Sequence, residues 1–409
     1  MSGALVTASP VDPRARGAPA AAALRAAAGR LGVRVHRAEE MPETLREGWQ
    51  ALAAEAAEPN AYAEPWFVAA GLHHFAKPGE VRLIEVRNGA ELVGILPLAV
   101  ERWHGRIPAR HVENWRHHHD FLGTPLVRAG FEQPFWSAVL ACLDAADWAP
   151  GFLHIDGLAE NGPVHRGLAA AAAAIGRNCP IVHGLTRAAL GSTLSPEAYF
   201  EANVRKKKRK ELKRLTNRLA EEGGLAVETL GASDEVGPWC DAFLALERAG
   251  WKGRRGTALA CEPATEAFFR EAIAGAQAAG RLDFLRLSVD GRPIAMLANF
   301  ITPPGSFSFK IASDEEFARF SPGVLIELEN LRVLRRDDVA WMDSCASEDH
   351  PMIDSLWGER RRIVRVSVPL SGFRRLWAYR LCRALEIVSA RRRLIFGGVV
   401  AAAGAEQFL

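Results

Sequence analysis

The sequence predicts an α/β fold in which a mixed sheet is built from two similar halves. In each half, two amphipathic helical patterns precede two apolar strand-like runs that a turn dipeptide separates. The dipeptides are Asn88-Gly89 in the first half and Asp290-Gly291 in the second, and both are typical of β-hairpins. The 409 residues are 49% hydrophobic and 24% charged, which is typical of globular proteins and excludes disordered, collagenous and multi-span membrane classes.

The expected elements occur in the same order in both halves: two helices, a hairpin, a strand, a helix and a strand. In the first half they lie at residues 42–57, 64–75, 81–86, 91–98, 120–127, 134–146 and 152–156. In the second half they lie at residues 236–249, 263–279, 282–289, 293–300, 306–312, 321–335 and 339–343. This repeated order indicates two structurally similar domains.

A long basic helix is expected between the halves, at residues 195–222. Ser195 can cap this helix, Pro196 suits its first position, and Glu197 complements its dipole. Leucines on one stripe of its C-terminal part predict packing there, and we expect the basic N-terminal part to be exposed.

Charge is unevenly distributed along the chain. Residues 205–218 contain nine basic residues and one acid, and residues 360–393 contain eleven arginines and one acid. The rest of the chain has 31 basic and 46 acidic residues. Basic runs of this kind suit an anionic partner such as a nucleic acid, a phospholipid surface or a phosphorylated ligand, or they form solvated helix faces.

Cysteine usage and targeting signals point to the cytoplasm. The six cysteines are scattered without a Cys-x-x-Cys pair, so we expect neither a disulfide framework nor a zinc ribbon. Arginines interrupt the Ala-rich start before any apolar stretch reaches the length of a signal peptide. The longest late charge-free run, residues 394–405, is too short for a membrane span.

A phosphate site is expected after the third strand of the second half. Ser321-Pro322-Gly323 places proline at a helix start and leaves first-turn N–H groups for a phosphate, unless it is only an ordinary helix start. Lys310 and Arg319 would add charge-assisted contacts.

Three spaced blocks carry a resemblance to a known family. They are Glu247-x-x-Gly250-Trp251-Lys252-Gly253, then Lys310-Ile-Ala-x-Asp314 with the following Ser321-Pro322-Gly323, and then Asp343-Ser-x-Ala346-x-x-x-His350-Pro. Taken together, over residues 62–357, these blocks resemble the CelD-type branch of the GNAT acyltransferase superfamily.

The resemblance implies tandem acyl-CoA N-acyltransferase (GNAT-like) domains, related to Fem-type peptidyltransferases, that use acyl-CoA or acetyl-CoA as co-substrate and an amine as acceptor. Its pyrophosphate loop would lie at residues 319–323, although the usual Q/R-x-x-G-x-G/A pattern is absent there. Fem-type relatives use aminoacyl-tRNA instead. We divide the chain into a flexible leader, a degenerate first domain, a bridging basic helix, a catalytic domain and a basic amphipathic tail, at residues 1–40, 41–190, 191–224, 225–360 and 361–409.

Amine attack on a thioester needs a general base and donors for the oxyanion. His350 is the first candidate base because an imidazole titrates near neutral pH, and Asp343 at a strand end would orient it. The alternative is that His350 only occupies the turn made by Pro351. Glu247 is the third catalytic candidate, near the C-terminal end of the helix expected at residues 236–249 and before the Gly-Trp-Lys-Gly turn.

Four residues are candidates for binding the acceptor. Trp251 and Lys252 lie in a turn where the resemblance places acceptor-binding residues, although Trp251 also suits a core. Asp314 on a polar loop would assist the base, bind the acceptor ammonium or remain solvated. Asp120 begins a stretch that resembles the first domain of the family and would line a cleft between the domains.

No metal site is expected. His117-His118-His119 invites a metal interpretation, but adjacent histidines on a strand point to opposite faces. The sequence also lacks the Ser-His-Asp spacing, Walker loop and GxGxxG motif of hydrolases, NTPases and dehydrogenases.

The C-terminal segment at residues 373–388 predicts an amphipathic helix. One face, with arginines beside it, carries Phe373, Leu376, Trp377, Leu381, Leu385 and Val388, and this suits the surface of an anionic membrane. The alternative is that this face packs on the catalytic domain. Nucleic acid is not expected as a partner, because no recognition module accompanies the basic runs.

These observations favour a cytoplasmic N-acyltransferase, peripheral on the inner face of the membrane if the tail binds lipid. The acceptor would be an amine of a lipid, as in ceramide-like synthesis, or of a polysaccharide precursor. One alternative is a Fem-like aminoacyl-tRNA-dependent transferase that binds RNA through residues 205–218. Another is a non-catalytic accessory protein of exopolysaccharide or cellulose biosynthesis.

Overall fold

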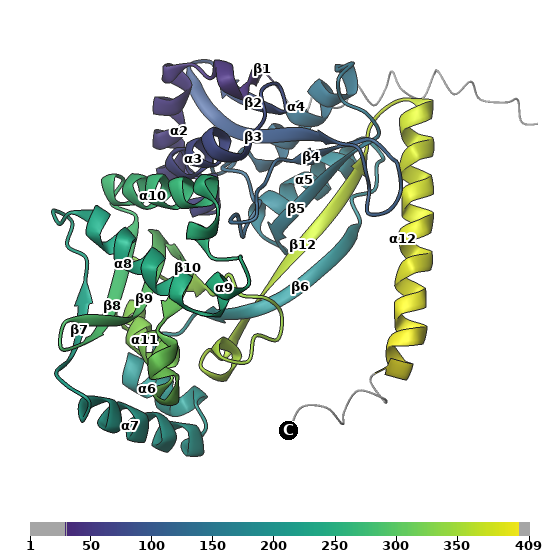
Figure 1. Ribbon diagram of the computed structural model, residues 1–409. Helices are drawn as coiled ribbons and strands as arrows, with labels where there is room; N and C mark the ends of the chain where they lie inside the picture. The colour runs from purple at the N-terminus through teal and green to yellow at the C-terminus, as the bar shows by residue number, and fades with distance from the viewer. Residues whose placement is uncertain (1–28, 30, 401–409) are drawn as a thin grey trace, which may run out of the picture.

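One mixed sheet runs through the molecule and joins its two halves (Figure 1). The computed structural model describes residue 29 and residues 31–400, and within these the sheet has 12 strands in the order β1-β2-β3-β4-β5-β12-β6-β11-β10-β9-β8-β7. In chain order the strands are β1 (Gly32–Arg37), β2 (Val81–Asn88), β3 (Glu91–Glu101), β4 (His111–Asn114), β5 (Phe152–Ala159), β6 (Ile181–Leu190), β7 (Leu225–Thr229), β8 (Leu282–Val289), β9 (Arg292–Thr302), β10 (Gly305–Ser313), β11 (Trp341–Asp343) and β12 (Glu359–Pro369).

Two long strands are exchanged between the halves at the centre of the sheet. β6 follows the first half in the chain but pairs with β11 of the second, and β12 follows the second half but pairs with β5 of the first. β6 and β12 also pair with each other, antiparallel. Outside them, the parallel pair β4 and β5 corresponds to the parallel pair β10 and β11. The predicted fold, a mixed α/β sheet built from two similar halves, is confirmed.

Helices cover both faces of this sheet. They are α2 (Glu43–Glu55), α3 (Pro65–Phe75), α4 (Glu132–Ala145), α5 (Pro163–Ala174), α6 (Pro196–Asn203), α7 (Lys206–Ala220), α8 (Val236–Ala249), α9 (Trp251–Arg254), α10 (Pro263–Ala278), α11 (Pro322–Asn330) and α12 (Phe373–Val400). In the first half, α4 and α5 bury apolar side chains on one face and α2 on the other. In the second half, α8 and α10 cover one face and α7 and α11 the other.

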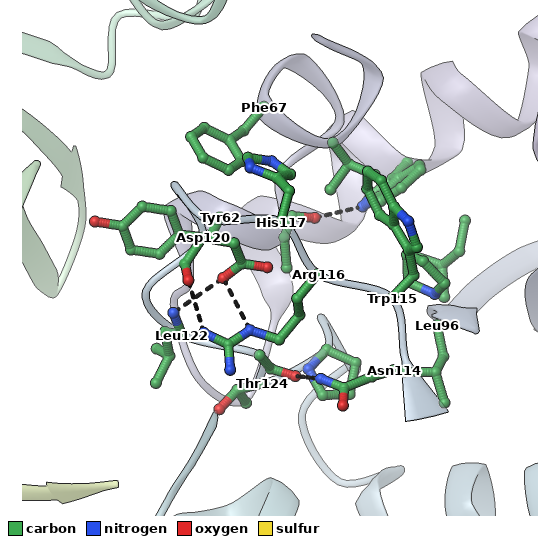
Figure 2. Close-up of a pocket in the computed structure, with 17 residues that line it drawn as sticks. Tyr62, Phe67, Leu96, Asn114, Trp115, Arg116, His117, Asp120, Leu122 and Thr124 are labelled. Carbon is green, nitrogen blue, oxygen red and sulfur yellow. Dashed lines mark hydrogen bonds and ion pairs between the residues drawn. The ribbon is translucent and has the colours of Figure 1, made fainter. Parts of the chain in front are cut away.

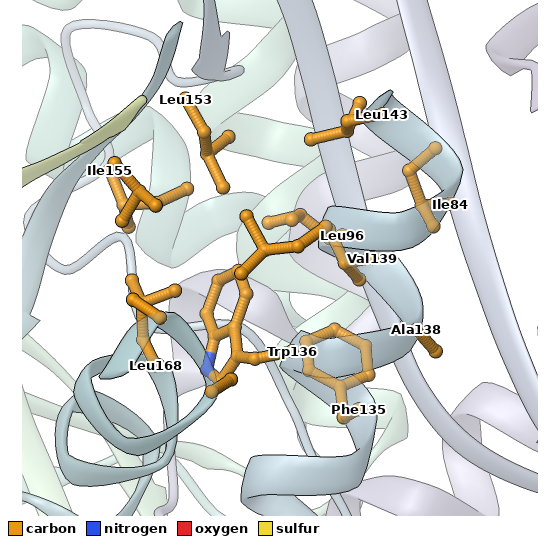
Figure 3. Close-up of a cluster of buried hydrophobic side chains, with 14 of the residues drawn as sticks. Ile84, Leu96, Phe135, Trp136, Ala138, Val139, Leu143, Leu153, Ile155 and Leu168 are labelled. Carbon is orange, nitrogen blue, oxygen red and sulfur yellow. The ribbon is translucent and has the colours of Figure 1, made fainter. Parts of the chain in front are cut away.

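The core of the first half lies between α4, α5 and the sheet (Figure 3). Alternation along β2 and β3 sends Ile84 and Leu96 into this core, where the Phe135 and Trp136 rings of α4 meet them. The buried Trp136 indole satisfies its N–H by donating to the carbonyl of Val164 at 3.0 Å. Periodic apolar residues therefore fix both the strands and the helices of this layer.

The two predicted hairpins form at the predicted places. In the second half, Asp290 and Gly291 both have positive φ angles, 48° and 77°, which a two-residue type I′ turn requires. In the first half, the turn connects Asn88, paired with Glu91, through Gly89 at φ 60°. Turn chemistry alone specifies these local features.

The basic segment between the halves is helical, as expected, but it is divided into α6 and α7 at Val204 and Arg205. Ser195 caps α6 by accepting a hydrogen bond from the N–H of Ala198 at 3.2 Å. In α7 the leucine stripe is buried and most of the basic residues are exposed, in agreement with the pattern in the sequence. The break lets both short helices follow the surface of the second half.

The strand expected at residues 120–127 is wrong, because this segment is irregular. The N–H of Gly123 donates to the carbonyl of Gly157 at 2.9 Å, and the two backbones approach closely. A Cβ at Gly123 would lie 2.0 Å from the carbonyl oxygen of Asp156, so glycine is needed there. Only its end approaches the sheet, where Val127 forms an isolated antiparallel bridge with Gly94 of β3.

Two strands lie in segments that the sequence analysis assigned to the leader and the tail. β1 is an edge strand within the predicted leader, whose residues 1–28 and 30 lie outside the described ones. β12 begins the predicted tail, whose residues 401–409 lie outside them. Three arginines at residues 360–362 obscured this strand, although Val366 and Val368 further along it are buried. The division into five parts stays a prediction.

A buried carboxyl on α11 gives a pH-dependent prediction. Burial raises the pKa of Glu327 from 4.5 to about 7, and its hydrogen bond from Asn330 Nδ2 at 3.1 Å does not offset this. Because the folded-state pKa is raised, stability is lost as pH rises from 4.5 through 7. Glu327→Gln should therefore raise the unfolding free energy by up to about 3 kcal/mol at pH 8 and change it little at pH 4. Thermal melts at both pH values check this, and an equal effect at both would contradict it.

Candidate active site at the junction of the halves

The two central strands of the second half diverge in the middle of the molecule. β10 and β11 run parallel, and their pairing ends at Phe307 and Asp343. Just beyond, β10 has a bulge between Ser308 and Lys310, so that Phe309 has no register partner on β9. A bulge leaves backbone groups of the extra residue unpaired and turns the neighbouring side chains. Backbone groups without sheet partners therefore lie next to Lys310.

A loop from the first half covers this point. Residues 115–125 follow β4, and their histidines reach α10 of the second half. The rings of His117 and His119 pack on Phe268, with centroid distances of 4.7 and 5.5 Å. Burial lowers the pKa of both imidazoles to about 3, so both are neutral at physiological pH.

The ammonium end of the Lys310 side chain lies against this loop. Its Nζ lies 3.2 Å from Nδ1 of His119 and 5.0 Å from the centre of the Phe121 ring. Burial, together with the positive charge of Lys252, lowers the pKa of Lys310 to about 8. A lysine with this pKa has a substantial neutral fraction near physiological pH and can accept a proton.

Lys252 and Glu247 lie beside Lys310 and form an ion pair. Nζ of Lys252 is 2.7 Å from Oε1 of Glu247 and 3.4 Å from the carbonyl oxygen of Ile311 on β10. Oε2 of Glu247 accepts from the N–H of Leu259 at 2.7 Å. Both carboxylate oxygens are therefore engaged, and Glu247 positions Lys252 rather than standing free as a base.

Asp343 lies at the end of β11, fully buried at 0% exposure. Its oxygens accept hydrogen bonds from Nη2 of Arg187 at 2.8 Å, from Arg361 at 3.1 Å and from the N–H of Cys345 at 2.9 Å. Nε of Arg187 also lies 2.6 Å from Oδ1, as an ion-pair contact. Burial alone would raise the pKa of Asp343, but the two guanidinium groups hold it below its usual value. The carboxylate is fully occupied by these donors.

The expected pair of Asp343 and His350 does not form. His350 follows a turn after β11, and its buried Nδ1 has no hydrogen-bond partner among the described residues. Its carbonyl accepts from the N–H of Asp354 at 3.0 Å, which is the turn role weighed as the alternative. The two arginines from β6 and β12 occupy Asp343 instead, and neither strand was predicted.

Tyr62 and Cys345 also belong to the cluster of side chains next to Asp343. The Tyr62 hydroxyl lies 3.2 Å from the Cys345 sulfur, and the Tyr62 ring packs edge-on against Phe307 and Phe121. Burial, assisted by the charge of Asp343, raises the pKa of the Cys345 thiol to about 12. A thiol with this pKa is not a nucleophile at neutral pH.

Asp120 lines a small cavity of about 30 Å³ in the first half (Figure 2). This volume admits a water molecule but not a substrate. Asp120 accepts from the N–H of Leu122 at 3.0 Å and lies 3.4 Å from Nε of Arg116, which also binds Asp156 at 2.7 Å. Burial raises the pKa of Asp120 to about 6 against the opposing charge of Arg116. In this structure Asp120 holds the loop in place.

The predicted phosphate-binding residues do not converge. Gly323 lies against Ser313, and Arg319 is exposed and pairs with Glu222 at 2.9 Å, on the face of the sheet that α11 covers. Lys310 points to the opposite face, toward the α8 and α10 side. The N–H groups of Val324 and Leu325 donate to the carbonyl of Ser321, whose φ is 54°, so fewer of them are available to a phosphate than the sequence indicated.

Trp251 and Asp314 lie at the solvent end of the site. The Trp251 side chain is 51% exposed at the start of α9, so the alternative that it fills the core is wrong. The backbone N–H of Trp251 donates to the Glu315 carboxylate at 2.6 Å, and this bond ties α9 to the loop after β10. Asp314 accepts from the N–H of Glu316 and pairs with Arg292 at 2.5 Å. Both remain candidates for contact with an acceptor.

The histidines at residues 117–119 do not form a metal site, since His119 contacts Lys310 and His118 is exposed. Among the described residues, the set whose ligand atoms converge is His73 and His74 of α3 with Glu271 of α10. Both imidazoles contact the same Glu271 oxygen, at 3.0 and 2.7 Å, and His73 and Glu271 are largely exposed. These contacts are those of a surface ion pair that ties the two halves together.

Sequence reasoning missed several residues of the cluster. The sequence pattern around His119 suggests only a metal ligand, and Tyr62 and Arg187 belong to no motif. The available signal was the aromatic and histidine density of residues 115–121, which is unusual for a surface loop. Lys310, which lies against this loop, was predicted from the sequence, but as a phosphate-binding residue.

Comparison with known proteins agrees with this architecture. Residues 206–350 match the family model described as an acetyltransferase (GNAT) domain. Over these residues the fold is of the GNAT type. Among curated proteins no sequence matches this chain. The CelD-type branch stays a prediction.

Solved structures with this fold cover most of the chain. The crystal structure of FemX has a TM-score of 0.54 at 10% identity and covers 79% of this chain and 95% of that chain. A conserved protein of unknown function from Bacteroides thetaiotaomicron has a TM-score of 0.52 at 11% identity, covering 81% and 98%. The C-terminal domain of a putative lysylphosphatidylglycerol synthetase from Agrobacterium fabrum has a TM-score of 0.50 at 13% identity, covering 86% and 96%. At these identities the likeness establishes the fold alone.

No helix within residues 31–400 has both the length and the hydropathy that a membrane span requires.

Proposed function

We propose that this protein is an acyltransferase that moves an acyl group from an acyl-CoA thioester to an amine at the junction of the halves. The observation that carries the proposal is the environment of Lys310. This lysine has a lowered pKa, lies at the bulge where β10 and β11 diverge, and belongs to the segment that matches the GNAT domain.

In the proposed reaction the neutral acceptor amine attacks the thioester carbonyl carbon. A C–N bond forms, the C–S bond breaks, and CoA leaves as a thiolate. Neutral Lys310 takes the proton that the amine nitrogen loses and passes it to the leaving sulfur, directly or through water. The N–H of Phe309, freed by the bulge, would donate to the developing oxyanion.

The remaining cluster residues position this chemistry. His119 is neutral and lies within hydrogen-bond distance of Nζ, so it orients Lys310 without adding a charge. Lys252 lowers the pKa of Lys310 by charge repulsion, and the ion pair with Glu247 holds Lys252 in place beside Lys310. The acceptor would enter past Trp251, whose exposed ring marks the open side of the cluster.

We further propose that the acceptor is an amine of a lipid, such as a long-chain base, with a polysaccharide-precursor amine as the alternative. The exposed apolar face of the C-terminal helix supports the lipid, because binding of this face to a membrane would bring the protein next to a source of such amines. The inner face of the membrane in the cytoplasm would then be the site of action.

Thiol release from acetyl-CoA and palmitoyl-CoA, with and without a long-chain base or an amino sugar, tests the function. Acceptor-dependent release of CoA supports the proposal, and preference for palmitoyl-CoA with the long-chain base supports the lipid. Absence of release from both donors, together with no thermal stabilisation by either, would contradict acyl-CoA use.

A second candidate is an aminoacyl-tRNA-dependent transferase. The exposed basic face of α7 favours it, because Lys206, Lys207, Lys210 and Lys213 lie on one surface helix without acidic partners among the described residues. Ribonuclease treatment separates the two candidates. It should leave acyl-CoA turnover unchanged and abolish an RNA-dependent transfer. A non-catalytic accessory protein would retain its cellular role in a Lys310→Met variant.

A further inference from the structure

The C-terminal helix α12 stands beside the sheet as a separate column (Figure 1). One face of its first half is fixed to the protein. Tyr379 and Cys382 pack against Phe152 of β5, and Glu386 accepts a hydrogen bond from His104. Arg375 donates to the carbonyl of Ala146 at 2.7 Å. These contacts determine which face of the helix points outward.

The outward face carries a continuous apolar stripe. Phe373, Trp377, Leu381 and Leu385 are 74, 59, 54 and 42% exposed. At four-residue spacing they advance by about 40° at each step, so they line one side of the helix. Large apolar side chains seldom gather on a surface without a partner to cover them.

Arginines lie within and beside this stripe. Arg374 and Arg380 are exposed on the same side, and three more follow at residues 391–393 in the sequence. Residues 373–393 contain seven arginines and one acid. Long arginine side chains next to an apolar stripe can reach phosphates while the stripe enters the acyl region.

We propose that the apolar stripe of α12 docks in the interface of an anionic phospholipid bilayer. Charge complementarity selects this partner, because each added arginine strengthens binding to an anionic surface. A second copy of the chain is disfavoured as the occupant, since antiparallel or parallel pairing of this face would bring arginines together. The helix lies in the plane of the bilayer, because its other face remains fixed to β5. This inference is independent of the proposed catalysis.

Co-sedimentation of the full-length protein with vesicles tests the proposal. Vesicles of phosphatidylcholine mixed with phosphatidylglycerol should bind it at least about tenfold more strongly than phosphatidylcholine alone, and added salt should weaken binding. The variant Phe373→Ser/Trp377→Ser/Leu381→Ser should lose this binding. Because all three side chains are exposed, the variant should fold normally, which its melting temperature checks.

A matched control is Val227→Ser, which removes an exposed apolar side chain from β7, an edge strand that is far in the sheet order from β5, the strand that α12 contacts. It should bind vesicles as the parent does. The proposal is overturned if the parent does not sediment with anionic vesicles or if the triple variant binds them equally. A parent dimer that the triple variant converts to a monomer, without vesicle binding, would assign the stripe to self-association instead.

Discussion

Lys310→Met is expected to lower kcat/KM for acyl transfer by about 10²- to 10⁴-fold, the range that a general base contributes. The methionine keeps the length and apolar stem of the buried lysine but cannot accept a proton. Packing against Phe121 and Phe309 should persist, so the melting temperature should change little. Steady-state kinetics with the best donor and acceptor from the CoA-release assay measure the effect.

The pH profile separates a base from a fixed positive charge. A neutral Lys310 is the active form, so kcat/KM should rise with pH through about 8 and then level off. Lys310→Arg should be as inactive as Lys310→Met, because its guanidinium stays protonated. The matched control Lys77→Met, at an exposed position just after α3, should keep full activity. Recovery of activity in Lys310→Arg would instead assign Lys310 to binding an anion.

Arg187→Met is expected to cost about 3–5 kcal/mol of unfolding free energy, because it leaves Asp343 buried with one arginine in place of two. Arg187 comes from β6 and Asp343 from β11, so their ion pair fastens the exchanged strand to the second half. Arg361 of β12 completes the contact at 3.1 Å. Urea denaturation measures the loss.

A matched control and a double variant define this result. Arg335→Met breaks an ion pair with Glu197 in which both side chains are exposed, and should cost far less than Arg187→Met because water screens the pair. The double variant Arg187→Met/Asp343→Leu should recover much of the loss, because it also removes the buried carboxylate that has lost one of its two arginines. A loss for Arg187→Met no larger than that of the control would refute a stabilising role for this pair.

The site was partly predictable. Glu247, Lys252 and Lys310 were selected from sequence blocks, and the structure brings these three together. His350 and Asp343 were also selected from a block, but the structure does not pair them. Seven positions separate them in the chain, and spacing cannot show that arginines from distant strands reach Asp343 first.

The sequence by itself determined the elements that local chemistry specifies. Apolar periodicity defined most of the helices, the Asp290-Gly291 turn defined a hairpin, and the leucine stripe of α7 marked its packed face. These features depend on neighbours within a few residues, so reading the chain in order is sufficient. The outward stripe of α12 was visible for the same reason.

Only the tertiary structure decided which segments meet at the centre. β6 and β12 are exchanged between the halves, and the loop at residues 115–125 crosses from one half to cover the other. The pKa of Lys310 falls because that loop and Lys252 together remove water and add charge around it. Burial depends on groups far apart in the chain, and so the chemistry of the junction became visible only when the two halves were folded together.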